Sequence, residues 1–244
     1  YRDEEASRLL RLGSNFVDNI KFDCTKDNFE ILPDVDYIIN CIGTIKPFMA
    51  ADPAAAIEIN SVFPWKLSEY CEKTNTKLIH ITTDCVYSGK KGSYTEEDSH
   101  DALDEYGKSK SIGEPNNCMV LRTSIIGEEI HKNGSLIEWV KGQRGKTING
   151  FTNHFWNGIT TKQYAKICDQ IIVENLYELN RFHVMSPYSV NKHELVSLLN
   201  NKYNLDITIE EFQTPEVVDR SLSTVKKLNE LLFIPSIEKQ IEEL

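Results

Sequence analysis

Short apolar strands alternate with helices in the first half of the chain, and this alternation constrains the fold more than any other feature. Strands are predicted at residues 35–40, 77–82 and 118–122, and helices at 52–73 and 106–114. Apolar strands joined by helices are typical of a parallel sheet, whose strands are buried on both faces. The sequence therefore predicts an α/β fold around a parallel sheet.

The second half of the chain has a less regular pattern. Its predicted helices cover residues 135–141, 161–176, 189–199 and 224–232, and its predicted strands cover 181–185 and 206–210. We expect a smaller C-terminal unit here. The predicted division is 1–126 and 127–244, with parts of 159–186 returning to the first unit.

A glycine-rich turn, which usually opens a dinucleotide-binding sheet, has no counterpart in the sequence. The first thirteen residues have the pattern of a polar helix and contain no glycine before Gly13. Such a turn supplies the backbone N–H groups that hold a pyrophosphate. We therefore expect a sheet lacking its first strand–turn–helix unit, and weak dinucleotide binding by these 244 residues.

Charge and cysteine usage exclude several classes of function. The formal net charge of −10 disfavours a general nucleic-acid binder, because the protein repels phosphate backbones. The six cysteines are scattered without a CxxC pair, which favours free thiols in a reducing cytoplasm over a zinc or disulfide framework. No run of 18 apolar residues occurs, so no membrane span is predicted.

Tyr106 and Lys110 form the central candidate for catalysis. Residues four apart share one face of a helix, and a nearby ammonium is expected to lower the pKa of a phenol. Such a tyrosine can protonate an alkoxide while a nicotinamide delivers hydride. The same spacing occurs at Tyr87–Lys91, in a polar loop, and at Tyr188–Lys192, across a predicted helix start. We expect Tyr188 and Lys192 to lie elsewhere.

Polar and small residues follow the predicted strands. Thr82-Thr83-Asp84-Cys85 ends one strand, where a hydroxyl can polarise a substrate carbonyl; capping of the next turn is the alternative. Asn40-Cys41-Ile42-Gly43 and Arg122-Thr123-Ser124 end two others, close to a predicted ligand. Asn60 is a polar residue in a largely apolar helix, placed to hold a water or a backbone carbonyl unless it lies on the surface.

Together these segments resemble the extended short-chain dehydrogenase/reductase family, closest to its dTDP-4-dehydrorhamnose reductases. The resemblance rests on Asn40–Gly43, Asn60, Thr82–Gly89, Tyr106–Lys110 and Leu121–Ser124, in that order. It implies a Rossmann-type parallel sheet, N-terminally truncated here, with a smaller C-terminal substrate-binding domain. It also implies a catalytic set of Thr83, Tyr106 and Lys110.

The same resemblance implies the other site residues. The expected cofactor is NADP(H), with NAD(H) as the alternative. The residues expected to contact it are Arg2, Asp23, Cys24, Cys41, Ile42, Gly43, Asn60, Thr82, Tyr106, Lys110, Thr123 and Ser124. Arg2 would suit the 2′-phosphate of NADP, and Asp23 the adenine. Those expected to contact substrate are Thr83, Asp84, Cys85, Ser124, His154, Trp156 and Arg220. For His154 and Trp156 the alternative is local packing, and for Arg220 a surface ion pair with Asp219 or Glu216.

The implied function is NAD(P)H-dependent reduction of a 4-keto group on a nucleotide-activated deoxysugar, in nucleotide-sugar or rhamnose biosynthesis in the cytoplasm. A nucleotide-sugar epimerase or dehydratase is an alternative, although Cys85 stands where a dehydratase usually has a second acidic residue. Another alternative is a non-catalytic regulatory subunit like that of methionine adenosyltransferase. No metal is expected, and a homodimer is one expected assembly because family members often dimerise through helices.

Overall fold

A parallel sheet of four strands forms the centre of the computed structural model, which describes residues 20–129 and 134–244. The strands are β1 (Tyr37–Asn40), β2 (Lys77–Thr83), β3 (Met119–Thr123) and β8 (Arg181–His183), in the order β1-β2-β3-β8. Tyr37 pairs with Lys77, and Ile79 with Met119. The predicted α/β fold with a Rossmann-type parallel sheet is confirmed. Among the described residues β1 is the outermost strand on its side of the sheet, and Ile39 there is 40% exposed.

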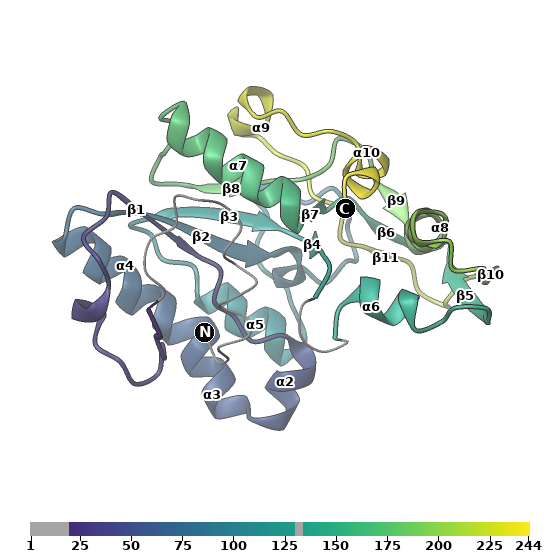
Figure 1. The fold of residues 1–244 in the computed structure, drawn as a ribbon, viewed down its shortest axis with the longest axis horizontal. Helices are drawn as coiled ribbons and strands as arrows, with labels where there is room; N and C mark the ends of the chain where they lie inside the picture. The colour runs from purple at the N-terminus through teal and green to yellow at the C-terminus, as the bar shows by residue number, and fades with distance from the viewer. Residues whose placement is uncertain (1–19, 130–133) are drawn as a thin grey trace.

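Helices cover both faces of the sheet (Figure 1). α4 (Phe63–Lys73) and α5 (Glu105–Ile112) lie on one face, and α7 (Thr161–Val173) lies on the other. Successive strand residues point to opposite faces, so Leu78 packs in the cluster on the α4 side and Ile79 in the cluster on the α7 side. Burial on both faces explains why the central strands read as continuous apolar runs.

The helix predicted at 52–73 is interrupted. It consists of α3 (Pro53–Ile57), a π-helical turn η2 (Glu58–Val62) and α4, while a short α2 (Lys46–Ala51) precedes it. Pro64 lies in the first turn of α4, where a missing N–H costs little. The predicted break near this proline is thus confirmed, and its form is a π-bulge, which often marks a functional site.

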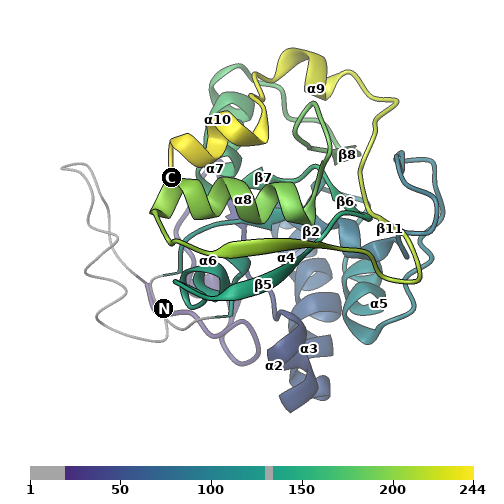
Figure 2. The same ribbon diagram turned by 90° about the vertical axis from the view of Figure 1, so that its right-hand side faces the viewer.

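A smaller lobe packs beside the sheet around a hydrophobic cluster of its own (Figure 2). Its helices are α6 (Leu136–Lys141), α8 (Lys192–Tyr203) and α10 (Ile237–Glu242). Its strands are β5 (Thr147–Phe151), β6 (His154–Trp156), β9 (Val190–Asn191), β10 (Thr208–Phe212) and β11 (Val218–Asp219). β5 pairs with β10, and β6 lies between β11 and β9.

Two elements join the lobes. β4 (Ile125–Ile126) pairs with β7 (Ile159–Thr160), directly before α7 returns the chain to the sheet. β8 then completes the sheet next to β3. The remaining elements are η1 (Phe29–Ile31), η3 (Asp84–Val86) and α9 (Leu228–Leu231).

Several predicted boundaries in the second half were wrong. The helix expected at 224–232 shrinks to the four residues of α9, and the helix expected from Ser189 begins at Lys192. Asn191 caps that helix and Glu194 closes a capping box, which fixes its start. The strands β5 and β6 were not predicted, because their half-exposed residues give no clear alternation.

Candidate active site

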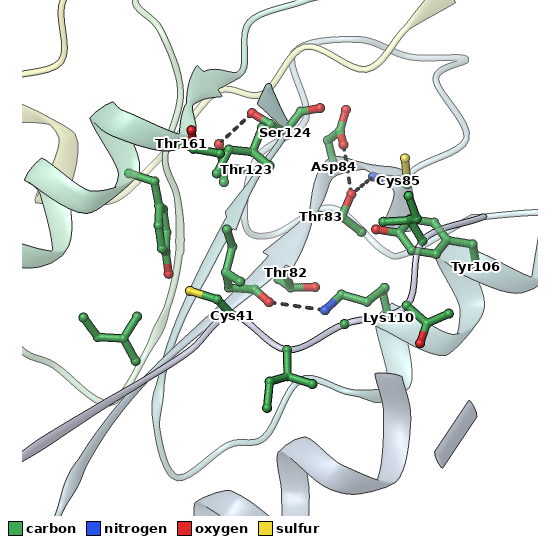
Figure 3. Close-up of a pocket in the computed structure, with 18 of the residues that line it drawn as sticks. Cys41, Thr82, Thr83, Asp84, Cys85, Tyr106, Lys110, Thr123, Ser124 and Thr161 are labelled. Atoms are coloured by element: carbon green, nitrogen blue, oxygen red, sulfur yellow. Dashed lines mark hydrogen bonds between the residues drawn. The ribbon is translucent and has the colours of Figure 1, made fainter. Parts of the chain in front are cut away.

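A cavity of about 1110 Å³ opens at the carboxyl ends of β1, β2 and β3 (Figure 3). This is the edge at which open α/β sheets bind ligands. It is lined by most of the residues that the sequence singled out, namely Cys41, Ile42, Gly43, Thr82, Thr83, Asp84, Cys85, Tyr106, Lys110, Thr123 and Ser124. Residues of α7, including Tyr164 and Cys168, line the side opposite α5.

The Thr83 hydroxyl lies at the end of β2, where the strand turns into η3. It donates a hydrogen bond to the Asp84 carboxylate over 3.0 Å and accepts one from the Cys85 N–H over 3.1 Å. The second bond is the turn cap that the sequence offered as the alternative for this threonine. The same hydroxyl also lies close enough to the Tyr106 phenol to lower its pKa, so capping and a place in the site are compatible.

Helix α5 presents Tyr106 and Lys110 on the face that lines the cavity. Asp104 caps the helix by accepting the Gly107 N–H over 2.8 Å. The Lys110 ammonium reaches the end of β2, where it donates to the Ile81 carbonyl over 3.3 Å. Thr83, Tyr106 and Lys110 therefore meet in one cavity, as the spacing predicted.

The electrostatics of the pair differ from the expectation. The pKa of the Tyr106 phenol is raised, mainly by burial and also by the neighbouring Cys85 and Asp84. Burial lowers the pKa of Lys110 to about 8, against a smaller opposing effect of Glu114 and Cys41. The expected lowering of the phenol pKa by Lys110 is thus wrong for this structure, in which desolvation dominates.

Asn60 holds the loop that follows β1. Its amide nitrogen donates to the Thr44 carbonyl over 2.9 Å, and its amide oxygen accepts the Thr44 N–H over 2.8 Å. The same nitrogen donates to Ser109 of α5 over 3.2 Å. The predicted contact with a backbone carbonyl is confirmed. Asn60 is buried behind Gly43 and does not itself line the cavity. It fixes the loop that lines it.

Two features of the cavity suit a bound polar ligand. The Thr82 hydroxyl is buried and, in residues 20–129 and 134–244, has no hydrogen-bond partner, although it lines the cavity. A buried hydroxyl without a partner is costly, and a ligand atom would relieve that cost. Gly43 also lines the cavity, so its backbone borders this space.

Among the described residues, two predicted cofactor contacts, Asp23 and Cys24, lie away from the cavity. Asp23 forms a turn with Thr25 and an ion pair with Lys26, and Cys24 packs against the apolar cluster under α4. Neither lines the cavity, because η1 and its flanking turns lie against α4. Arg2 falls outside the described residues.

Arg122 also differs from the expectation that it meets the ligand. Its guanidinium points away from the cavity into a buried ion pair with Glu114, with N–O distances of 2.7 to 3.1 Å. It also donates to the Tyr87 hydroxyl over 3.1 Å. Side chains alternate along a strand, so Thr123 reaches the cavity and Arg122 faces the opposite side.

The predicted substrate residues of the smaller lobe lie near this site without lining the cavity. Arg220 donates through Nε to the Tyr87 carbonyl over 3.1 Å, and its charge acts on the Asp84 carboxyl. No ion pair of Arg220 occurs in the described part of the chain, so its predicted surface pairing is not seen. His154 forms a hydrogen bond with Thr214 and stacks on Phe151, and Trp156 is buried. These contacts match local packing, which was the alternative to substrate binding for both residues.

Sequence reasoning missed one lysine. Lys46 lines the cavity with its ammonium 5.7 Å from the centre of the Tyr106 ring, and it pairs with Asp104 over 2.8 Å. Lys192 was expected to lie elsewhere and is not among the residues that line the cavity, although its charge favours the ionised form of Asp84. Only the position of Lys46, just after the loop containing Gly43, is a sequence signal. Tyr188 is 73% exposed.

No helix in residues 20–129 or 134–244 combines the length and the apolar character needed to cross a bilayer. The same residues hold no group of three or more His, Cys, Asp or Glu side chains placed to bind a metal ion.

Comparison with known proteins identifies the family. The family described as RmlD substrate binding domain matches residues 23–225, most of the chain. The chain belongs to this family. The match includes the ends of the three cavity-lining strands and both lysines of the Tyr-Gly-Lys-x-Lys segment.

Individual relatives of this RmlD family member have different roles. The "Probable low-salt glycan biosynthesis reductase" of Haloferax volcanii is 25% identical over 86% of this chain and 77% of its own length. A dTDP-4-dehydrorhamnose reductase of Aggregatibacter actinomycetemcomitans is 29% identical over 70% of the chain and 67% of its own. Methionine adenosyltransferase 2 subunit beta of Rattus norvegicus is 26% identical over 69% of the chain, which spans only 54% of that subunit.

Solved structures share the fold. The dTDP-4-dehydrorhamnose reductase of Bacillus anthracis, in complex with NADP, has a TM-score of 0.71 at 22% identity, covering 85% of this chain and 79% of its own. A UDP-N-acetylglucosamine 4-epimerase of Methanobrevibacter ruminantium has a TM-score of 0.73 at 20% identity, covering 92% and 80%. At these identities the likeness concerns the fold.

Proposed function

We propose that this protein reduces a 4-keto group on a nucleotide-activated deoxysugar, using NADPH or NADH. The observation that carries the proposal is the meeting of Thr83, Tyr106 and Lys110 in one cavity at the carboxyl edge of the sheet. Membership of the RmlD family supports a sugar nucleotide as substrate. The related reductases and the NADP-bound structure support the reaction type and the cofactor.

The residues present fit the nicotinamide and ribose end of such a cofactor. The unpartnered Thr82 hydroxyl, the backbone at Gly43 and the Lys110 ammonium border the same space, and Lys110 suits ribose hydroxyls. When bound, the cofactor supplies the hydride that the sugar carbon receives. Among the described residues that line the cavity, Lys46 and Lys110 are the cations, and no glycine-rich turn is present. Weak binding by these 244 residues stays a prediction.

Each polar side chain has a distinct role in the proposed reaction. The Thr83 hydroxyl orients the substrate carbonyl, and the Tyr106 hydroxyl transfers its proton to the carbonyl oxygen as that oxygen becomes an alkoxide. The raised pKa of Tyr106 keeps the phenol protonated at neutral pH. The protonated phenol can therefore donate to the developing alkoxide. Asp84, Cys85 and Ser124 border the sugar, and Arg220 and His154 border the more distant part of the substrate.

Substitution of Tyr106 tests the assignment. Tyr106→Phe removes the proton donor and should lower kcat by at least about a hundredfold with little change in substrate affinity. Turnover is measured as NADPH oxidation with dTDP-4-dehydro-6-deoxysugars. Tyr188→Phe is the matched control, because its ring is exposed and it should retain the parent rate. Activity of Tyr106→Phe within about threefold of the parent would refute the role of Tyr106.

A regulatory role is the second candidate, favoured by the methionine adenosyltransferase subunits among the relatives. A non-catalytic subunit needs no proton donor, so the convergence of Thr83 with Tyr106 favours the reductase. If the protein reduced no keto-sugar nucleotide but changed the rate of a methionine adenosyltransferase on mixing, the regulatory reading would replace ours. A homodimer and a cytoplasmic location also stay predictions.

A further inference from the structure

His80 is a buried histidine that the proposed reaction does not use. It lies on β2 between Ile79 and Ile81, and none of its surface is exposed. Both ring nitrogens have partners. Nε2 lies 3.0 Å from the Gly113 carbonyl oxygen, and Nδ1 lies 3.0 Å from the Asn40 side-chain nitrogen. A buried imidazole costs free energy unless its nitrogens are paired, so these two contacts allow the ring to lie inside the sheet layer.

The partners of His80 determine where its proton lies. A carbonyl oxygen only accepts, so Nε2 carries the hydrogen that is donated to Gly113. The side-chain oxygen of Asn40 accepts the Ile42 N–H over 3.0 Å, which identifies the other atom of that amide as the nitrogen. This nitrogen donates to Nδ1, which therefore carries no hydrogen. A neutral imidazole protonated at Nε2 satisfies all three hydrogen bonds together.

The surroundings of His80 favour the same neutral state. Burial lowers the pKa of this imidazole to about 3, and the charge of Lys110 on α5 acts in the same direction. The carbonyls of Gly113 and Asn40 favour the protonated ring, with a smaller effect. A second positive charge beside the Lys110 ammonium would be repelled. The ring is therefore expected to stay neutral throughout the physiological pH range.

The three hydrogen bonds from Gly113 through His80 and Asn40 to Ile42, here called the His80 relay, connect two parts of the cavity wall. Gly113 is the C-cap of α5, the helix that carries Lys110. Ile42 lies in the loop after β1 and lines the cavity. The His80 relay therefore joins the helix of the catalytic lysine to the loop on the cofactor side of the cavity, through groups that are buried at its centre.

Asn60 makes a second connection between this loop and α5. It bonds the backbone of Thr44 in the loop and the hydroxyl of Ser109 in the helix. The His80 relay holds both elements at other points, so the two connections together restrain rotation of the loop as well as its distance from the helix. Gly43, whose backbone borders the cavity, lies between the two loop residues that are held.

We propose that His80 is a positioning residue for the cofactor side of the cavity: its neutral imidazole, protonated at Nε2, holds the loop after β1 in place relative to α5. The backbone at Gly43 and the Lys110 ammonium are thereby kept at a fixed separation for the nicotinamide and ribose end of the cofactor. His80 acts only through Asn40 and Ile42. The effect on cofactor binding rests on the proposed reductase function, whereas the His80 relay itself does not.

The first test observes the proton directly in the parent protein. Long-range proton–nitrogen NMR of protein labelled with nitrogen-15 histidine distinguishes the two neutral tautomers from each other and from the protonated ring. Loss of the signal in His80→Asn or His80→Gln assigns it. We expect an Nε2–H ring that stays neutral between about pH 5 and pH 8, the range in which an ordinary histidine titrates. An Nδ1–H tautomer, or protonation in this range, would overturn the proposal.

Two variants separate the ends of the His80 relay. In His80→Gln the amide nitrogen can still donate to Gly113, but the contact with Asn40 is lost. In His80→Asn the amide oxygen can still accept from Asn40, but the contact with Gly113 is lost. Hydrogen exchange of the Ile42 amide should therefore accelerate about fivefold in His80→Gln, the scale of one hydrogen bond, and stay near the parent rate in His80→Asn. Parent-like exchange in His80→Gln would contradict the relay.

The functional arm measures cofactor kinetics. In His80→Gln, KM for NADPH should rise about fivefold with kcat changed less, because the loop is loosened while Tyr106 stays in place. His193→Gln, on α8 in the smaller lobe, is the matched control and should keep the parent values of KM and of Ile42 exchange. Faster exchange with an unchanged KM would refute the positioning role. If the parent reduces no keto-sugar nucleotide, the proposed function fails, and the NMR and exchange measurements still decide whether His80 holds the loop.

Discussion

Lys110 is a buried cation whose position has an energetic cost. Only 6% of the residue is exposed, and burial lowers its pKa from 10.5 to about 8. The hydrogen bond to the Ile81 carbonyl and the charge of Glu114 compensate this burial only in part. A lysine kept in such a place at the centre of a cavity is typical of a functional group, since an apolar residue would be more stable there.

The pKa of Lys110 predicts how stability depends on pH. Its folded-state pKa lies below its unfolded-state value, so the unfolded chain binds more protons between about pH 8 and 10.5, and the folded state gains stability as pH rises through that range. Lys110→Met should therefore be more stable than the parent at pH 7, and its advantage should shrink above pH 8. Urea denaturation at a series of pH values measures this. An advantage that stays constant from pH 7 to pH 10 would contradict the assigned pKa.

Helix α5 owes its position to a glycine in the Tyr-Gly-Lys segment. A Cβ at Gly107 would come within 2.2 Å of the Cys85 carbonyl and 2.5 Å of the Ala102 side chain. The helix therefore approaches the turn η3 more closely than any other residue would allow. This approach brings Tyr106 beside Thr83, which explains the need for glycine next to the proton donor.

Gly107→Ala tests the importance of this approach at the level of the element. The added methyl group should push α5 away from η3 and separate Tyr106 from Thr83, which costs about tenfold to a hundredfold in kcat. Overpacking should also cost about 1–3 kcal/mol of unfolding free energy. Gly142→Ala, whose added Cβ would lie 3.3 Å from the Trp139 carbonyl oxygen, is the control for turnover and should leave kcat unchanged. Parent-like turnover in Gly107→Ala would show that the contact does not position Tyr106.

The segment η2 joins two elements of the site. Its Asn60 bonds the loop after β1 and Ser109 of α5, and the carbonyl of Asn60 lies where a Cβ of Gly113 would be, at 1.8 Å. A regular helix would rotate Asn60 away from one of these partners. The π-bulge therefore allows the single side chain of Asn60 to hold both the loop and α5.

At the scale of the whole molecule, a buried ion-pair network connects the sheet with the loops behind it. Glu114 follows α5, and its side chain is 2% exposed; the Arg122 side chain on β3 is 4% exposed. Tyr87 links Arg122 to His183 of β8, with hydrogen bonds of 3.1 Å on each side. His183 in turn contacts the carbonyls of Tyr94 and Ser223.

Glu114→Gln tests this network. The change leaves the buried Arg122 charge without its carboxylate, and it should cost about 3–5 kcal/mol of unfolding free energy. Chemical denaturation at pH 7 measures the loss. Glu58→Gln removes the half-exposed pair with Lys66, 2.7 Å long, and should cost less than about 1 kcal/mol. Equal losses of unfolding free energy in the two variants would show that the buried Glu114 pair stabilises the protein no more than the half-exposed pair does.

The sequence by itself determined the sheet strands, the helix α5 and the polar strand ends that meet in the cavity. These follow from local patterns: continuous apolar runs for buried strands, a four-residue spacing for Tyr106 and Lys110, and the rule that the carboxyl ends of parallel strands share one edge. The sequence-based predictions failed for features that depend on which residue of a distant element packs against a given side chain.

Only the tertiary structure decided those remaining features. The pattern of β3 does not reveal that Arg122 meets Glu114, because both partners read as ordinary charged residues in sequence. Nor does it reveal that the charge of Lys192 lowers the pKa of the Asp84 carboxyl, since the two belong to different lobes. The pKa of Tyr106 rises because the phenol is buried and lies near Cys85 and Asp84, and burial is a property of the packed molecule. The periodicity of apolar residues indicates which face of a helix or strand is buried. The residues that pack against that face are determined by contacts between elements that are distant in the chain.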